Sequence, residues 1–122
     1  MKDLTKAEEQ IMMILWEREE AFVKDILSDM PEPKPAYNTV STIVRILESK
    51  GFVGYTTEGK SHRYHPLVQK ESYMKHAAGG LLKSYFNDSL SGLVSFFSKQ
   101  GDINAHELDE LMELIKKERE KK

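Results

Sequence analysis

The sequence predicts a mainly α-helical fold that contains one small β-hairpin. Apolar residues recur at helical spacing in six segments, and proline- or glycine-containing stretches separate several of them. Only two short runs, residues 52–56 and 61–65, are rich in β-forming residues, and a glycine-containing turn joins them.

Length and composition restrict the classes of protein that remain. The 122 residues allow one hydrophobic core, or a small domain with a helical appendage that completes its burial in an oligomer. Charged residues make up 31% and apolar residues 39%, so we expect a folded chain. The chain has no cysteine, which excludes disulfides and thiolate zinc sites and fits a reducing compartment. Residues 1–10 lack the apolar core of a signal peptide, and no apolar run approaches about 18 residues, so we expect a cytoplasmic protein.

The first two helices are indicated by caps, periodicity and breakers. Thr5 is followed three residues later by Glu8, a capping-box pattern, and the apolar positions after it predict a helix that reaches Arg18. Residues 22–30 carry apolar side chains on one helical face and predict a shorter second helix. Pro31 and the proline-rich stretch that follows end this helix.

The third helix, residues 38–49, carries two stripes of different character. One stripe is apolar and predicts burial; its members are Val40, Ile43, Val44 and Leu47. The opposite face is short, hydrogen-bonding and uncharged or positive; it contains Asn38, Thr42, Arg45 and Ser49, with Ser41 at its edge. It has no carboxylate near its first turns.

Two interpretations of this polar face remain open. Ser, Thr and Asn are poor helix formers, so their presence favours selection for a partner: short polar side chains let a helix approach base edges, and Arg45 can reach guanine or phosphate. Alternatively, Asn38 and Thr39 cap the helix, and Ser41 and Thr42 are incidental.

The hairpin completes a winged helix-turn-helix. Gly51 ends the third helix, and residues 52–56 and 61–65 are joined by "TEGK". Three helices and a two-stranded ribbon predict a DNA-binding domain whose third helix enters the major groove while the ribbon contacts backbone. The candidate DNA-binding residues come from the helix and the ribbon: Asn38, Thr39, Ser41, Thr42, Arg45, Lys60, Ser61, His62 and Arg63.

Charge supports this interpretation locally. The whole chain has a net charge of −2, but residues 34–65 carry five cationic side chains and two carboxylates, a net charge of +3. The field at one face, rather than the total charge, decides binding to nucleic acid.

Metal binding and catalysis are not expected. His62 and His65 fall on opposite faces of a strand and have no acidic or third ligand nearby; His76 and His106 are isolated and expected at the surface. We expect Tyr64 to pack under the ribbon rather than to stack on a base. No motif unites a nucleophile, a base and an orienting group, so we expect neither an enzyme nor a cofactor.

The remaining residues predict a helical dimerisation domain at 69–122, after a DNA-binding domain at 1–68. The tail is rich in large apolar side chains but too short to bury them alone, so the same segment of a second chain is the simplest partner. Packing of the tail against its own winged helix is the alternative. Asn104 and Glu107 indicate a capped final helix. The candidate dimerisation residues are apolar and helical: Leu81, Leu82, Tyr85, Phe86, Leu93, Val94, Phe97, Leu108, Leu111, Met112 and Ile115.

Three stretches resemble the penicillinase-repressor family of the BlaI/MecI type. "LTKAEEQIMMILW" is similar to its opening signature through Leu4, Thr5, Glu8, Ile11, Met12, Leu15 and Trp16. "YNTVSTIVRILESKGFV" is similar to its recognition helix through Thr39, Val40, Thr42, Leu47, Lys50 and Gly51. "EGKSHRYHPLV" is similar to its wing through Gly59, Tyr64 and Pro66.

The resemblance implies a homodimeric bacterial repressor that binds a palindromic double-stranded operator. In the best-known family members, a membrane sensor with a metalloprotease domain triggers cleavage of the dimerisation region, which implies such a sensor system as a partner here. Three departures are visible. Arginine stands at position 45, where the family carries it at the position of Ile46; Phe96-Phe97 replaces an Asn-Phe pair; and the cysteine motif of copper-responsive relatives is missing.

The function predicted from the sequence is therefore sequence-specific repression by a DNA-binding homodimer. The alternative from another class is a winged-helix module that docks a protein instead of DNA. This alternative predicts no DNA affinity that depends steeply on salt concentration. It also predicts a large exposed apolar patch outside the dimer interface.

Overall fold

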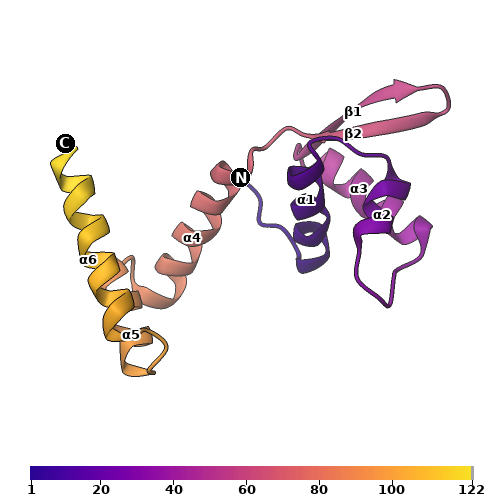
Figure 1. Ribbon diagram of the computed structural model, residues 1–122. Coiled ribbons are helices and arrows are strands. Elements are labelled where there is room, and N and C mark those ends of the chain that lie inside the picture. Colours follow the sequence, from indigo (N-terminus) through magenta and orange to yellow (C-terminus); the bar gives the residue numbers. More distant parts are fainter. Residues whose placement is uncertain (122) are drawn as a thin grey trace. The chain divides into compact units, whose positions relative to one another are not determined.

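The computed structural model describes residues 1–121 and divides into two compact units. The first unit is Met1–Ala77, and the second begins at Ala78. In the described part of the chain there are six helices and two strands, in the order shown in Figure 1. The mainly helical fold with one hairpin is confirmed.

The first unit contains three helices, α1 (Lys6–Arg18), α2 (Val23–Asp29) and α3 (Tyr37–Ser49). The capping box predicted for α1 is present: the Thr5 hydroxyl accepts from the Glu8 amide at 3.2 Å, and the Glu8 carboxylate accepts from the Thr5 amide at 2.8 Å. Together these bonds satisfy two N–H groups that a helix start leaves unpaired.

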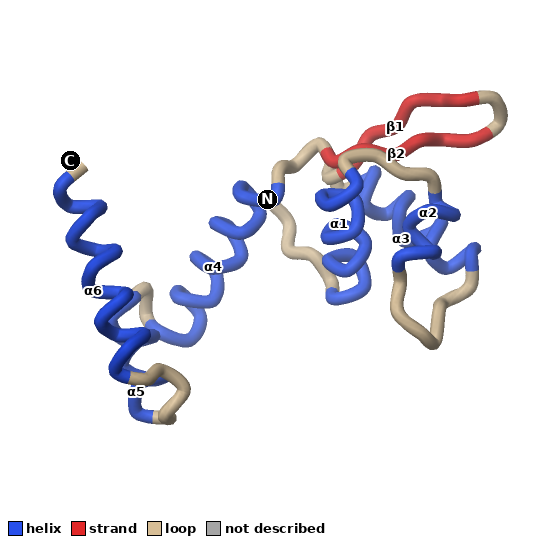
Figure 2. The backbone as a smooth tube through the Cα atoms, viewed as in Figure 1, coloured by secondary structure: helices blue, strands red, loops and turns tan. Residues whose placement is uncertain are grey.

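A two-stranded antiparallel hairpin follows, with strands β1 (Val53–Glu58) and β2 (Ser61–Pro66), drawn red in Figure 2. Glu58 pairs with Ser61, so Gly59 and Lys60 form a two-residue turn in which Gly59 has φ of +61°. Glycine adopts this left-handed conformation without the steric cost that a Cβ adds.

A third extended segment pairs with the hairpin. Ala21, between α1 and α2, exchanges two backbone hydrogen bonds with Tyr64, at 2.9 and 2.8 Å. This bridge attaches the hairpin to the segment between α1 and α2 and so helps to position the hairpin relative to α3. The sequence pattern did not predict it.

The hydrophobic core of the first unit joins α1, α2, α3 and the hairpin. Its fourteen buried residues are Ile11, Met12, Leu15, Ala21, Val23, Ile26, Met30, Val40, Val44, Leu47, Phe52, Val53, Tyr64 and Tyr73. Tyr64 is 6% exposed, which confirms the prediction that it packs under the ribbon. The predicted apolar stripe of α3 is buried at Val40, Val44 and Leu47, and Ile43 packs against the core.

One buried ion pair ties α1 to the end of α3. The Lys50 ammonium lies 2.7 Å from the Glu8 carboxylate, and Glu8 is only 3% exposed. Burial raises the pKa of Glu8, but hydrogen bonds from Lys50 and Thr5 and the charge of Lys50 outweigh it and leave the pKa below its usual value.

The start of α4 (Lys70–Phe86) belongs to the first unit. The Tyr73 hydroxyl accepts from the Leu4 amide at 2.9 Å, and the Trp16 indole donates to the Val68 carbonyl at 2.9 Å. These bonds connect residues far apart in the sequence. They hold the segment after the hairpin against α1.

The second unit contains the rest of α4, then α5 (Leu90–Lys99) and α6 (Ala105–Glu120). Asn104 caps α6 by accepting from the Glu107 amide at 2.8 Å, as the sequence predicts. Ser89 caps α5, which the sequence analysis did not predict. None of the described side chains of α5 and α6 is fully buried. Across residues 1–121, every helix is too short or too polar to cross a bilayer.

Candidate nucleic-acid interface

The polar face of α3 begins at an uncapped helix terminus. The helix starts at Tyr37, and its N-cap residue, Ala36, makes no side-chain hydrogen bond. Asn38 and Thr39 therefore lie inside the first turn, and the alternative that they cap the helix is wrong. The Thr39 amide donates to the Ala36 carbonyl at 3.1 Å, whereas the Tyr37 and Asn38 amides have no acceptor among the described residues. These two donors and the helix dipole favour a nearby anion.

The predicted polar residues of α3 are accessible. Asn38, Thr39, Thr42 and Arg45 are exposed, and Ser41 is half-buried. The Thr42 hydroxyl donates to the Asn38 carbonyl at 2.9 Å, while Arg45 makes only a long 3.4 Å contact with the Ser41 hydroxyl. The guanidinium of Arg45 thus retains most of its donors for a partner.

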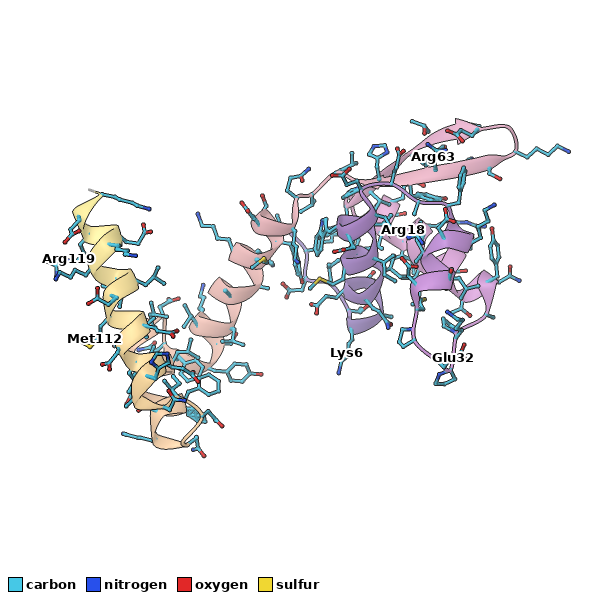
Figure 3. The ribbon with its side chains drawn as sticks, viewed as in Figure 1. Lys6, Arg18, Glu32, Arg63, Met112 and Arg119 are labelled. Atoms are coloured by element: carbon cyan, nitrogen blue, oxygen red, sulfur yellow. The ribbon has the colours of Figure 1, made fainter. Side chains whose placement is uncertain are left out.

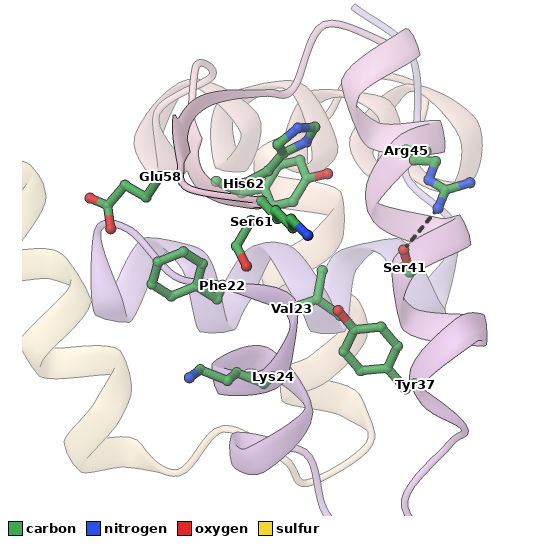
Figure 4. A pocket seen from close by; sticks show the side chains of 11 residues that line it. Phe22, Val23, Lys24, Tyr37, Ser41, Arg45, Glu58, Ser61 and His62 are labelled. Atoms are coloured by element: carbon green, nitrogen blue, oxygen red, sulfur yellow. Dashed lines mark hydrogen bonds between the residues drawn. The ribbon is translucent and has the colours of Figure 1, made fainter.

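A groove of about 480 Å³ separates α3 from the hairpin and the start of α2. Figure 4 shows its walls, with Tyr37, Ser41 and Arg45 on one side and the hairpin residues on the other. The lining residues are Phe22, Val23, Lys24, Tyr37, Ser41, Arg45, Glu58, Lys60, Ser61, His62 and Tyr64. Five of the nine predicted DNA-binding residues are brought together here: Ser41, Arg45, Lys60, Ser61 and His62. Asn38, Thr39, Thr42 and Arg63 do not line this groove.

Three cations of the groove have no anionic partner. Among the described residues, no carboxylate lies within 4.0 Å of Lys24, Arg45 or Lys60. Glu58 is the only carboxylate among the described lining residues. These three cations can therefore bind a phosphate in the groove without first breaking an ion pair.

The other cations of residues 34–65 are used inside the protein. Lys34 donates to three carbonyls at the end of α2, those of Leu27, Ser28 and Met30. Lys50 pairs with Glu8. The local charge of +3 therefore overstates the positive charge that is available to a partner.

Arg63 is also engaged internally. Its guanidinium bonds to Glu20 at 3.0 Å and to Glu58 at 2.9 Å, and it lies over the Phe22 ring at 5.1 Å. These bonds use two of its five N–H donors, and the two carboxylates reduce the positive potential that Arg63 offers to a phosphate. Of the two hairpin cations, Lys60 at the turn is the more available.

The hairpin histidines lie on opposite faces, as predicted. His62 stacks on Tyr55 with ring centroids 4.0 Å apart and an angle of 8° between the planes, whereas His65 lies opposite Gly54. Burial raises the pKa of Tyr64, which stays protonated at neutral pH. Residues 1–121 contain no group of three His, Asp or Glu side chains arranged to hold a metal ion.

Sequence reasoning missed two accessible residues of the groove, Lys24 and Tyr37. Lys24 belongs to α2 and lies outside the stretch chosen for the charge count, and Tyr37 precedes the predicted start of α3. The sequence signal these residues share is a place in the first turn of a helix, which is too common to mark a binding site.

The second unit carries a separate apolar groove of about 620 Å³ between α5 and α6. Met112 and Arg119, labelled on α6 in Figure 3, both line it. Five of the predicted dimerisation residues line it: Val94, Leu108, Leu111, Met112 and Ile115. Their side chains remain accessible, with Met112 68% and Ile115 49% exposed.

The fold and the groove define a winged helix-turn-helix protein of the kind that binds DNA. The DNA-binding domain of the repressor BlaI has the same fold, with a TM-score of 0.51 and 21% identity over 60% of this chain and 94% of that chain. Monomeric Bacillus licheniformis BlaI, solved in complex with the blaP half-operator, gives a TM-score of 0.50 and 19% identity over 59% and 89% of the two chains.

The family is shown by the sequence as a whole. The family model described as penicillinase repressor matches residues 4–117, and the chain belongs to this family of transcriptional repressors. The methicillin resistance regulatory protein MecI of Staphylococcus aureus is 22% identical over 116 residues, which cover 94% of each chain. MecI of Mammaliicoccus sciuri is likewise 22% identical over 94% of each chain. The resemblance, the winged-helix fold and the exclusion of an enzyme are confirmed.

Proposed function

We propose that this repressor is cytoplasmic and binds a palindromic DNA operator as a homodimer, with residues 1–68 contacting DNA and residues 69–122 forming the dimer. The observation that carries the DNA contact is the joint exposure of α3 and of three cations without carboxylate partners along one groove. MecI and BlaI, its relatives, are named as regulators, and BlaI was solved on a half-operator.

In this proposal one group of residues contacts base edges and a second group contacts the DNA backbone. Asn38, Ser41, Thr42 and Arg45 face base edges from α3, whose uncapped amides face a phosphate. Thr39, Lys60, Ser61 and His62 contact the backbone at the flanks. Arg63 orients the hairpin through Glu20 and Glu58 and contributes less to phosphate binding than Lys60, because both carboxylates offset its charge.

The experiment starts from duplexes selected by the full-length protein from a random pool. Arg45→Ala should weaken binding to the selected duplex by about 1–3 kcal/mol, and Lys60→Ala should lower the slope of log affinity against log salt by about 1. Lys6→Ala removes an exposed cation from α1 and is the matched control. Equal affinities of Arg45→Ala and the parent protein in fluorescence anisotropy would contradict the assignment.

The dimer is supported by the accessible apolar groove of α5 and α6. Two joined domains that bind half-sites about 34 Å or a multiple of it apart gain avidity that a single domain lacks. Ile115→Glu places a charge in the groove and should raise the dimer dissociation constant by at least about 100-fold. Ser95→Glu adds the same charge at an exposed position of α5 outside the groove and should leave it unchanged. Sedimentation equilibrium measures the dimer dissociation constant of the parent and of both variants. A monomeric parent protein would refute the proposal.

Release by a membrane-sensor protease also belongs to this proposal. Phe96 and Phe97 lie within α5, 43% and 40% exposed, so a cut between them would separate α6 from the DNA-binding domain. Immunoblots of induced cells should then show a shortened chain. A chain that stays full-length while repression is lifted would rule this route out.

A further inference from the structure

The exposed face of α3 has an apolar edge that the groove does not use. Ile46 is 43% exposed, and it is not among the apolar residues that pack against the core, although its neighbour Ile43 is. Single exposed apolar side chains are common on protein surfaces, and Met13 on α1 is another. Ile46 differs from Met13 in its place, because it lies on α3 beside the polar face proposed to contact DNA.

The helical geometry puts this edge beside the proposed DNA contacts. At about 100° per residue, Asn38 lies opposite the buried stripe, with Arg45 on one side of it and Thr42 and Ile46 on the other. Arg45 lines the groove, as Figure 4 shows, so Thr42 and Ile46 form the edge of the face away from the hairpin. The two residues are four apart, hence neighbours on the helix surface.

The chemistry of this edge excludes most base contacts. Ile46 has no polar atom, and the Thr42 hydroxyl donates its hydrogen to the Asn38 carbonyl at 2.9 Å. The edge thus lacks the bidentate donors that recognise guanine and the amide that recognises adenine. The C5-methyl group of thymine is the apolar feature of the major groove, and it is the base feature that an isoleucine beside a threonine methyl complements.

We propose that Ile46, supported by Thr42, determines specificity by packing against a thymine methyl group at one position of each half-site. This inference rests on the proposed function, because it needs α3 to lie in the major groove. It adds a base preference that depends on a methyl group rather than on a hydrogen bond. Arg45 and Ile46 then read different base pairs from the two edges of the same helix face.

The test pairs one change in the protein with one in the DNA. The probe is the duplex selected by the parent protein, with each thymine replaced in turn by uracil, which removes only the methyl group. One replacement in each half-site should weaken binding of the parent by about fourfold per methyl group. Ile46→Ala should weaken binding to the thymine duplex by a similar factor and lose the response to uracil at that same position. Alanine is the best helix former, so this variant retains α3.

The matched control is Met13→Ala, since Met13 is 46% exposed and belongs to α1 rather than to the proposed recognition helix α3. This variant should keep the full response to uracil. The proposal is overturned if uracil has no effect at any position, or if Ile46→Ala responds to uracil as strongly as the parent. It is also overturned if Ile46→Ala changes the sedimentation behaviour without DNA, which would place a second chain on Ile46. Failure of the parent to select any sequence would instead refute the proposed function itself.

Discussion

Glu58→Gln should increase the affinity of the protein for DNA. Glu58 is the one carboxylate among the described residues of the groove, and it pairs with Arg63 at 2.9 Å. Removing its charge leaves Arg63 paired with Glu20 at 3.0 Å, so the hairpin keeps its attachment. An exposed ion pair of this kind contributes about 0–1 kcal/mol, and we expect the folded structure to persist.

The magnitude follows from the distance between charges. A phosphate about 7 Å from the carboxylate is repelled by roughly 0.6 kcal/mol in bulk water and by roughly 2.4 kcal/mol at an effective dielectric constant of about 20. Screening over a Debye length of about 8 Å reduces both values by more than half at physiological salt. The expected gain is about 0.3–1 kcal/mol, or about two- to fivefold in affinity.

Fluorescence anisotropy at several salt concentrations is the assay. The gain should be largest at low salt and vanish toward 1 M, where the Debye length is about 3 Å. Glu71→Gln, which removes an exposed carboxylate from α4 outside the groove, is the control. An affinity that falls at low salt, or a gain that persists in 1 M salt, would refute the electrostatic reasoning.

Three further predictions concern the parts that hold the site in place. Lys50→Met should destabilise the first unit by about 2 kcal/mol, because it leaves the Glu8 carboxylate buried without its cation; urea unfolding at pH 7 measures this, with Lys70→Met as the control. Because the pKa of Glu8 is lowered in the folded state, the parent keeps this stability above the ordinary carboxyl pKa and loses it as the pH falls through the folded-state pKa. If stability falls with decreasing pH in the Lys50→Met variant just as it does in the parent, the assignment is contradicted. Gly59→Ala should cost about 1 kcal/mol, since a Cβ is strained at φ of +61° although it meets no atom within 4 Å, and an unchanged melting temperature would show that the turn relaxes freely. Tyr73→Phe should cost about 1 kcal/mol by leaving the Leu4 amide without its acceptor, and hydrogen exchange at Leu4 that stays as slow as in the parent would count against this.

The sequence predicted the elements well because each one has a local cause. The capping box of α1, the apolar stripe of α3 and the glycine at the hairpin turn are all patterns within a few residues. The same holds for the Asn104 cap of α6. The start of α3 was placed one residue late, because Tyr37 adds no polar signal and the true N-cap, Ala36, has no capping side chain.

The distribution of charge in the site could not be predicted in the same way. Arg63 finds Glu20 across 43 positions of sequence, and Lys50 finds Glu8 across 42. Such pairs depend on the bridge between Ala21 and Tyr64 and on the packing of α1 against α3, which periodicity does not encode. A count of charges treats all cations as equal. In the folded protein, however, Lys34, Lys50 and Arg63 bind carbonyl or carboxylate groups of the chain itself.

The local distribution of charge nevertheless explains how a chain of net charge −2 can bind a polyanion. Carboxylates more than a Debye length of about 8 Å from the groove are screened and have little influence on a phosphate inside it. What remains is the local set of Lys24, Arg45 and Lys60, opposed by a Glu58 whose charge Arg63 offsets. With so few unpaired cations, one domain alone should bind DNA weakly. The proposed homodimer would add a second DNA-binding domain, and the accessible apolar groove of α5 and α6 is the surface on which that proposal rests.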